Sequence, residues 1–134
     1  MGGYGALRQA FIHMDRFAKV IAMSPTSDIE FAARFSSAMG VESKYIMGDW
    51  KTLKGSELDL MTMAQDAAGT GERVPDILII MADEDHMVRD TTEFEKKLNE
   101  LQLKNEFRLY PGDHSWKFWD AHIEECIDWL TDRN

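Results

Sequence analysis

The sequence has 134 residues, enough for one domain with a substantial hydrophobic core. Hydrophobic residues make up 44% of it and charged residues 29%, which is typical of a globular protein and excludes a disordered chain. The formal net charge of −9 argues against nucleic acid or an anionic membrane as a partner, because phosphate groups attract basic surfaces.

No segment has the pattern of a membrane anchor or of a secretory signal. The apolar runs are shorter than the ~18 residues of a membrane-spanning helix. The first residues lack the charged and apolar regions of a signal peptide. Cys126 is the only cysteine, which excludes an intrachain disulfide and a cysteine-based metal site. We therefore expect a cytoplasmic protein.

The first half of the chain predicts helices around one strand. Residues 2–14 have helical spacing of apolar side chains, although glycines crowd the start of this segment. Residues 17–24, FAKVIAMS, predict a short buried strand that Pro25 ends. Residues 28–39 predict a second helix, and one more helix is expected within residues 56–67.

The second half predicts two strands and two helices. DILIIMA, residues 76–82, is typical of a central parallel strand that is covered on both faces. Residues 91–103 predict a helix that opens with a capping box formed by Thr92 and Glu95. An edge strand follows at residues 105–112.

Alternating apolar positions orient the last two of these elements. In the edge strand, Phe107 and Leu109 are expected to point inward and Arg108 outward. The final helix, about residues 116–132, is expected to bury one apolar side. That side consists of Trp119, Ile123, Cys126, Ile127 and Leu130.

This order of elements predicts an α/β fold in a single domain, residues 1–134. It contains about three parallel strands with helices on both faces, and residues 76–82 form the central strand. Active sites in such folds lie at the carboxyl ends of the strands. Two loops fall there, ADEDHMV after the second strand and PGDHSW after the third.

These loops supply an acid followed by a histidine. Either Asp83 or Asp85 in the first loop could orient His114 in the second, and the imidazole would then act as a general base. The order Asp-then-His is that of an α/β-hydrolase triad. His86 beside Asp85 suggests a metal site, but no third ligand falls at a useful spacing along the chain, so no metal is expected.

Three stretches resemble the carboxyl-terminal half of the esterase D and tributyrin-esterase group of α/β hydrolases. They are MGGYGAL at the start, ADEDHMV, and PGDHSWKFWDAHI. That group has a nucleophile elbow G-x-S-M-G-G-x-G-A-L, an acid loop of the G-T-E-D type and a histidine loop G-x-H-x-W-x-x-W. The stretch GSELDL, residues 55–60, is also similar to the tributyrin-esterase-like members.

The resemblance implies a serine esterase that acts on short acyl esters without metal or cofactor. It implies that Asp85 is the acid, with Asp83 as the alternative, and that His114 is the base. The nucleophilic serine would directly precede Met1, whose backbone N–H would serve the oxyanion hole. Gly2 and Gly3 would be elbow glycines. Trp116, close to His114, is a candidate substrate contact.

Other interpretations remain open. The chain is alternatively a non-catalytic, truncated remnant or an interaction module of the same fold. None of its own serines at 24, 27 and 56 has the sequence of an elbow. The strand at 17–24 would lack the neighbour that ends at the nucleophile, so we expect homo-oligomers or aggregates that form through this edge.

Overall fold

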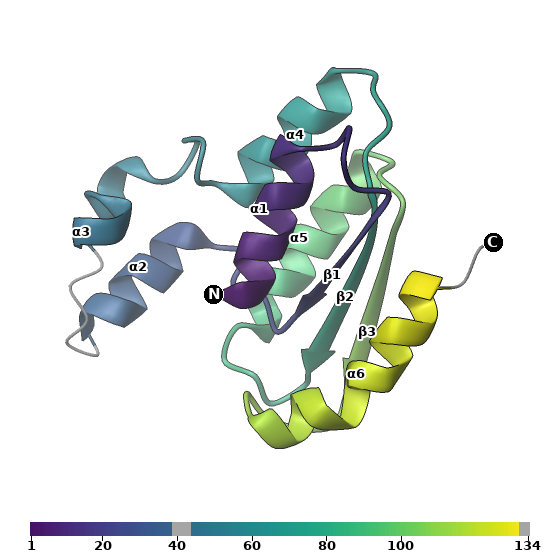
Figure 1. The fold of residues 1–134 in the computed structure, drawn as a ribbon. Coiled ribbons are helices and arrows are strands. Elements are labelled where there is room, and N and C mark those ends of the chain that lie inside the picture. The colour runs from purple at the N-terminus through teal and green to yellow at the C-terminus, as the bar shows by residue number, and fades with distance from the viewer. Residues whose placement is uncertain (39–43, 132–134) are drawn as a thin grey trace.

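The computed structural model describes residues 1–38 and 44–131. At its centre is a three-stranded sheet in the order β1-β2-β3, formed by β1 (Lys19–Met23), β2 (Asp76–Ala82) and β3 (Asn105–Tyr110) (Figure 1). Both pairings are parallel. The sequence-based prediction of a parallel sheet with residues 76–82 at its centre is confirmed.

Helices cover both faces of the sheet, as the sequence predicts. Helices α1, α4 and α5 pack on one face and α6 on the other, while α2 and α3 lie to one side of the sheet (Figure 1). The helices in chain order are α1 (Gly2–Ile12), α2 (Ile29–Ala38), α3 (Lys44–Met47), the 3₁₀ turn η1 (Trp50–Thr52), α4 (Leu60–Gly69), α5 (Val88–Glu100) and α6 (Trp116–Thr131).

The core divides at β2, whose residues are all buried. Ile77 and Ile79 face the side of α1, α4 and α5, whereas Leu78, Ile80 and Ala82 face α6. Alternate side chains of a strand point to opposite faces, so an uninterrupted apolar run fits a strand that is covered twice. Because every residue of β2 is buried, the position of its last residue, Ala82, in the fold is fixed, and so is the start of the loop that follows.

Helix α5 starts three residues before its predicted position, and the predicted capping box is wrong. The helix begins at Val88, so Thr92 lies inside it and donates to the carbonyl oxygen of Val88 (2.8 Å). Glu95 accepts from the side-chain amide of Asn99 instead of capping the helix. The cause is the turn at Asp85, which starts the helix directly after β2.

The predicted burial is also wrong for Leu109 and for much of α6. Leu109 lies on the same face of β3 as Phe107, which packs against the core, but it is 50% exposed. On α6 the buried residues are Phe118 and Cys126, and burial raises the pKa of the Cys126 thiol. The three aliphatic residues on the predicted inner side, Ile123, Ile127 and Leu130, are between 44% and 53% exposed.

Smaller differences concern the ends of elements. The helix expected within residues 56–67 is observed at Leu60–Gly69, where Asp59 caps it by accepting from the backbone N–H of Met61. The predicted helix ends at residues 39 and 132 lie outside the described residues. Among the described residues, no helix is both long enough and apolar enough to cross a membrane.

The outer edge of β1 is open within the described part of the chain. The N–H of Ser24 bonds to Ile80 and the carbonyl of Ala18 bonds to Asp76, so the even-numbered residues of this segment face β2. Backbone groups alternate along a strand, and the N–H and C=O of Ile21 therefore point to the other side. An open strand edge is a template for pairing with another chain.

We expect the isolated chain to associate through the β1 edge. Size-exclusion chromatography with light scattering should show dimers or larger species whose fraction grows with concentration. Ile21→Pro removes the N–H that faces outward without breaking the β1–β2 ladder, and it should shift the distribution toward monomer.

The matched control is Leu109→Pro on β3, the opposite edge strand, because the backbone N–H of Leu109 also points away from β2. This variant should associate as the unchanged chain does. Monodisperse monomer at every concentration would contradict the prediction, and a shift produced only by Leu109→Pro would move the interface to β3.

Candidate functional site

A buried carboxylate stands in the loop that follows the central strand. Asp85 has a side chain that is 0% exposed, and its Oδ1 accepts from the backbone N–H of Met87 (3.0 Å). The backbone carbonyl oxygen of Asp85 accepts from the backbone N–H of Val88 (2.9 Å), which is the first residue of α5. A buried carboxylate needs such partners, because an unpaired charge in the interior is costly.

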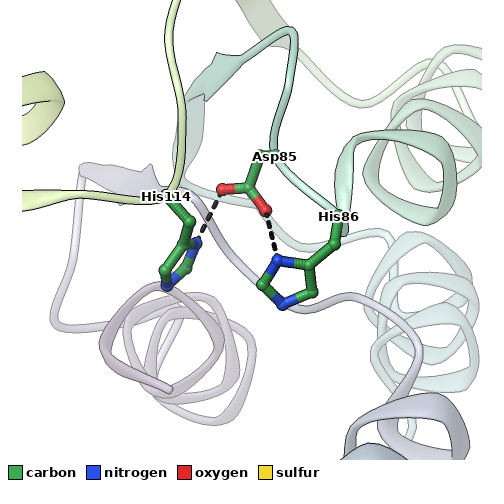
Figure 2. A group of neighbouring side chains, drawn as sticks. All are labelled: Asp85, His86 and His114. Carbon is green, nitrogen blue, oxygen red and sulfur yellow. Dashed lines mark hydrogen bonds and ion pairs between the residues drawn. The ribbon is translucent and has the colours of Figure 1, made fainter.

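His114 supplies the second partner of this carboxylate. Its Nδ1 lies 2.7 Å from Oδ2 of Asp85, within hydrogen-bond distance (Figure 2). Asp83, the alternative acid, instead accepts from the backbone N–H of Gly112 (3.0 Å). The structure therefore pairs His114 with Asp85, at the distance expected for an acid that orients a base.

The loop after β2 also fixes the loop that carries His114. Gly112 donates to Asp83 and accepts from the N–H of Glu84 (3.0 Å). Gly112 has a φ of +150°, and a Cβ there would lie 2.8 Å from Cδ2 of Phe118. A glycine is required at this position, both for the backbone conformation and for the close approach of α6.

A polar network holds α6 against β3. Glu125 accepts from Tyr110 (2.8 Å) and Arg108 (3.1 Å), and its other oxygen lies 2.7 Å from Nδ1 of His122. Burial raises the pKa of Glu125, but these hydrogen bonds outweigh burial and lower it overall. The bond to Glu125 raises the pKa of Tyr110. The network fixes the helix that directly follows the His114 loop.

A groove with a volume of about 540 Å³ adjoins His114. It brings several of the predicted site residues together, because the amino-terminal residues lie opposite the histidine loop. Trp116 stands at this groove with 82% of its surface exposed, and it packs edge-on against Trp119. The lining residues are Met1, Gly2, Gly3, Ile21, Met23, Ser24, His114, Trp116, Trp119, Asp120 and Ile123.

Ser24 is a groove residue that sequence reasoning did not select. It is buried at the carboxyl end of β1 with a φ of +44°, an uncommon conformation for a residue with a side chain. Its Oγ accepts from Nε1 of Trp119 (3.1 Å), and the Trp119 ring packs edge-on against His114. The sequence around Ser24 carries no signal of this positive φ.

His86 lies on the other side of the buried carboxylate. Its Nδ1 is 3.7 Å from Oδ1 of Asp85, and its ring is 5.3 Å from that of His114 (Figure 2). Phe35 of α2 stacks on the outer face of His86 at 5.0 Å between ring centroids. No third ligand lies near this pair along the sequence, but the fold brings His114 beside it from the next loop.

The amino-terminal glycines have different roles. A Cβ on Gly3 would lie 2.8 Å from the carbonyl oxygen of Met23 and 2.9 Å from Cα of Pro25, both at the end of β1. Gly2 and Gly5 have nothing within 4 Å of such an atom. Only Gly3 is needed for the close approach of α1 to the sheet, and this approach places the start of α1 at the groove.

Comparison with known proteins yields one family model and several relatives. The model of the esterase family matches residues 1–130. An acetyl esterase of Caldicellulosiruptor saccharolyticus is 25% identical over 137 aligned residues, which cover 98% of this chain and 52% of that protein. The chain thus spans about half the length of this relative.

Solved structures of related hydrolases are also matched by this chain over about half of their length. An S-formylglutathione hydrolase of Staphylococcus aureus is similar with a TM-score of 0.84 and 27% identity, covering 97% of this chain and 51% of that one. A fluorophosphonate-binding serine hydrolase of the same organism has a TM-score of 0.87 and 26% identity, covering 96% and 50%. About half of each hydrolase therefore has the fold described above.

The glycine contacts predict how α1 responds to alanine. Gly3→Ala should lower the free energy of unfolding by about 1–3 kcal/mol, because the new methyl group overlaps backbone that cannot move freely. Gly5→Ala is the matched control in the same helix and should raise it by up to about 1 kcal/mol. Urea denaturation followed by circular dichroism measures both, and equal effects would contradict the close approach.

Proposed function

This chain belongs to the esterase family, and from that premise we propose that it carries the acid and the base of a serine carboxylesterase that cleaves short acyl esters. The nucleophilic serine would be supplied by the residue that precedes Met1 in a longer polypeptide. The relatives are about twice the length of this chain, which leaves room for such a segment in the complete domain.

The observation that carries this proposal is the pairing of Asp85 with His114 at 2.7 Å beside the groove. The carboxylate is fully buried, whereas the imidazole is 33% exposed. One ring nitrogen of His114 is therefore held by the acid, and the other remains available for a reacting proton. This division of roles between the two nitrogens is what a triad requires.

Acylation would use the pair as follows. The serine Oγ attacks the ester carbonyl carbon while Nε2 of His114 takes the hydroxyl proton. Asp85 stabilises the resulting imidazolium and stays ionised itself. The tetrahedral intermediate then collapses, the bond from carbon to the alcohol oxygen breaks, and His114 gives its proton to the leaving alcohol.

Deacylation would repeat these steps with water. His114 takes a proton from water, the hydroxide attacks the acyl-serine, and the proton passes to the serine Oγ as the acid leaves. In the longer polypeptide the backbone N–H of Met1 would face the developing oxyanion, because Met1 lines the same groove as His114. Trp116 would contact the acyl or alcohol group there.

A non-catalytic interaction module is the second candidate, favoured by one specific observation. Among the described residues, β1 is an edge strand with outward-facing backbone groups, and α6 has an exposed aliphatic side. Such surfaces suit association with another chain. The two candidates differ in whether a serine placed before Met1 produces an esterase.

The 134-residue chain alone should hydrolyse p-nitrophenyl acetate no faster than background, because none of its own serines lies in a nucleophile elbow. Release of p-nitrophenol, followed by absorbance, measures this rate. Robust turnover that survives His114→Ala would contradict the assignment of the base.

An extended protein, in which a segment ending in the G-x-S of an elbow precedes Met1, should be active in the same assay. His114→Ala in it should lower kcat/KM by about 10³-fold or more, and Asp85→Asn should lower it by less, because the base itself remains. The lost step is proton transfer, so kcat should fall with kcat/KM.

Two matched variants serve as controls in the extended protein. Asp83→Asn keeps the oxygen that accepts from Gly112, and His13→Gln changes a histidine at the end of α1. Both should retain most of the activity. An inactive extended protein that folds normally would favour the interaction module, and a larger loss from Asp83→Asn than from Asp85→Asn would transfer the acid role to Asp83.

A further inference from the structure

Three side chains with metal-ligating atoms meet at the end of the sheet. Asp85 and His86 come from the loop after β2, and His114 comes from the loop after β3. One ligand atom of each lies within 4.8 Å of the others, with both imidazoles beside the same carboxylate (Figure 2). Within residues 1–38 and 44–131, this is the one such group of His, Cys, Asp or Glu residues.

The separations are close to those of a metal centre. Ligand atoms bound at ~2.0–2.2 Å in a tetrahedral zinc site lie about 3.4 Å from one another. The Oδ1 of Asp85 and the Nδ1 of His86 are 3.7 Å apart, so this pair needs almost no movement. The Nδ1 of His114 lies 2.7 Å from the other oxygen of this carboxylate, Oδ2, and this hydrogen bond would open to admit an ion.

The three side chains differ in how firmly they are held. Asp85 is fully buried and fixed by the N–H of Met87, so it provides a rigid anchor. The side chains of His86 and His114 are 43% and 33% exposed, which leaves both rings room to rotate toward an ion. Phe35 stacks on His86, with 5.0 Å between the ring centroids.

The donor set selects the class of ion. Two imidazoles and one carboxylate suit zinc and its neighbours among the divalent transition metals, whereas magnesium and calcium prefer oxygen ligands alone. One carboxylate compensates half of the charge of a divalent ion, and water completes the coordination. The formal net charge of −9 favours the approach of a cation to the chain.

We propose that Asp85, His86 and His114 form a binding site for a divalent transition-metal ion, and that metal binding and acid–base catalysis by His114 exclude each other. Binding exchanges three water ligands of the hydrated ion for two ring nitrogens and one carboxylate oxygen. Any imidazolium present releases its proton to solvent. The second half of this proposal, mutual exclusion, rests on the proposed esterase function.

Exclusion follows whichever nitrogen of His114 binds. If Nδ1 coordinates the ion, the hydrogen bond to Asp85 is lost and the remaining proton sits on Nε2, which then cannot accept the proton of serine. If Nε2 coordinates instead, its lone pair is already used. The metal would therefore act as a reversible inhibitor that is removed by chelation.

Binding is tested on the tag-free 134-residue chain. Calorimetric titration with zinc chloride should show one ion per chain, and cobalt(II) should give visible absorption bands of a tetrahedral complex. His86→Gln should weaken zinc binding by at least about tenfold. His13→Gln, the matched control outside the group, should bind as the unchanged chain does. Circular dichroism confirms that each variant is folded.

Magnetic resonance of the histidine rings gives a second readout that does not depend on a variant. Zinc should shift the ring signals of His86 and His114 and leave those of His13 and His122 in place. Absence of saturable binding, or an equal loss of affinity in His86→Gln and His13→Gln, would overturn the site. Shifts confined to His13 or His122 would also overturn it.

Exclusion is tested separately in the extended protein. Zinc should abolish ester hydrolysis, a chelator should restore it, and His86→Gln should need at least about tenfold more zinc for the same inhibition. Zinc that binds to the 134-residue chain without inhibiting an active extended protein would overturn mutual exclusion while leaving the esterase function intact. An inactive extended protein would overturn the esterase function, and with it the exclusion, but not the binding site.

Discussion

The buried carboxylate of Asp85 is the constraint on which the rest of the site depends. A charge without solvent must be matched by donors, and the chain supplies the backbone N–H of Met87 and the ring of His114 from a second loop. The same turn ends β2 and begins α5, so the position of the acid is fixed by the central strand itself. His114 is placed both by this anchor and by its own loop, which Asp83 and Glu84 hold through Gly112.

Apolar patterning predicted the sheet because β2 is buried on both faces, and a run such as DILIIMA fits no exposed element. The acid could not be chosen between Asp83 and Asp85 from spacing alone, since both follow the strand. The structure separates them by their partners, Gly112 for one and His114 for the other. The third ligand beside His86 escaped prediction for a related reason, because it comes from a different loop.

The exposed aliphatic side of α6 escaped prediction for another reason. Periodicity identifies an apolar side of a helix but not what covers it, and in α6 the covering element is absent among the described residues. Ile123 belongs both to that exposed side and to the groove beside His114. The surface that invites association is therefore continuous with the surface that would receive substrate, and a partner seated on one would reshape the other.

The reactivity of the Cys126 thiol provides a way to measure how firmly α6 is packed on the sheet. Cys126 lies on the buried side of α6, and burial raises the pKa of its thiol, so it is a poor nucleophile toward alkylating reagents while α6 packs on the sheet. The thiol becomes reactive only when α6 separates from the sheet, an opening that need not unfold the rest of the chain. The rate at which Cys126 is alkylated therefore reports how often the helix that follows the histidine loop lifts away, and a partner bound across α6 would slow it.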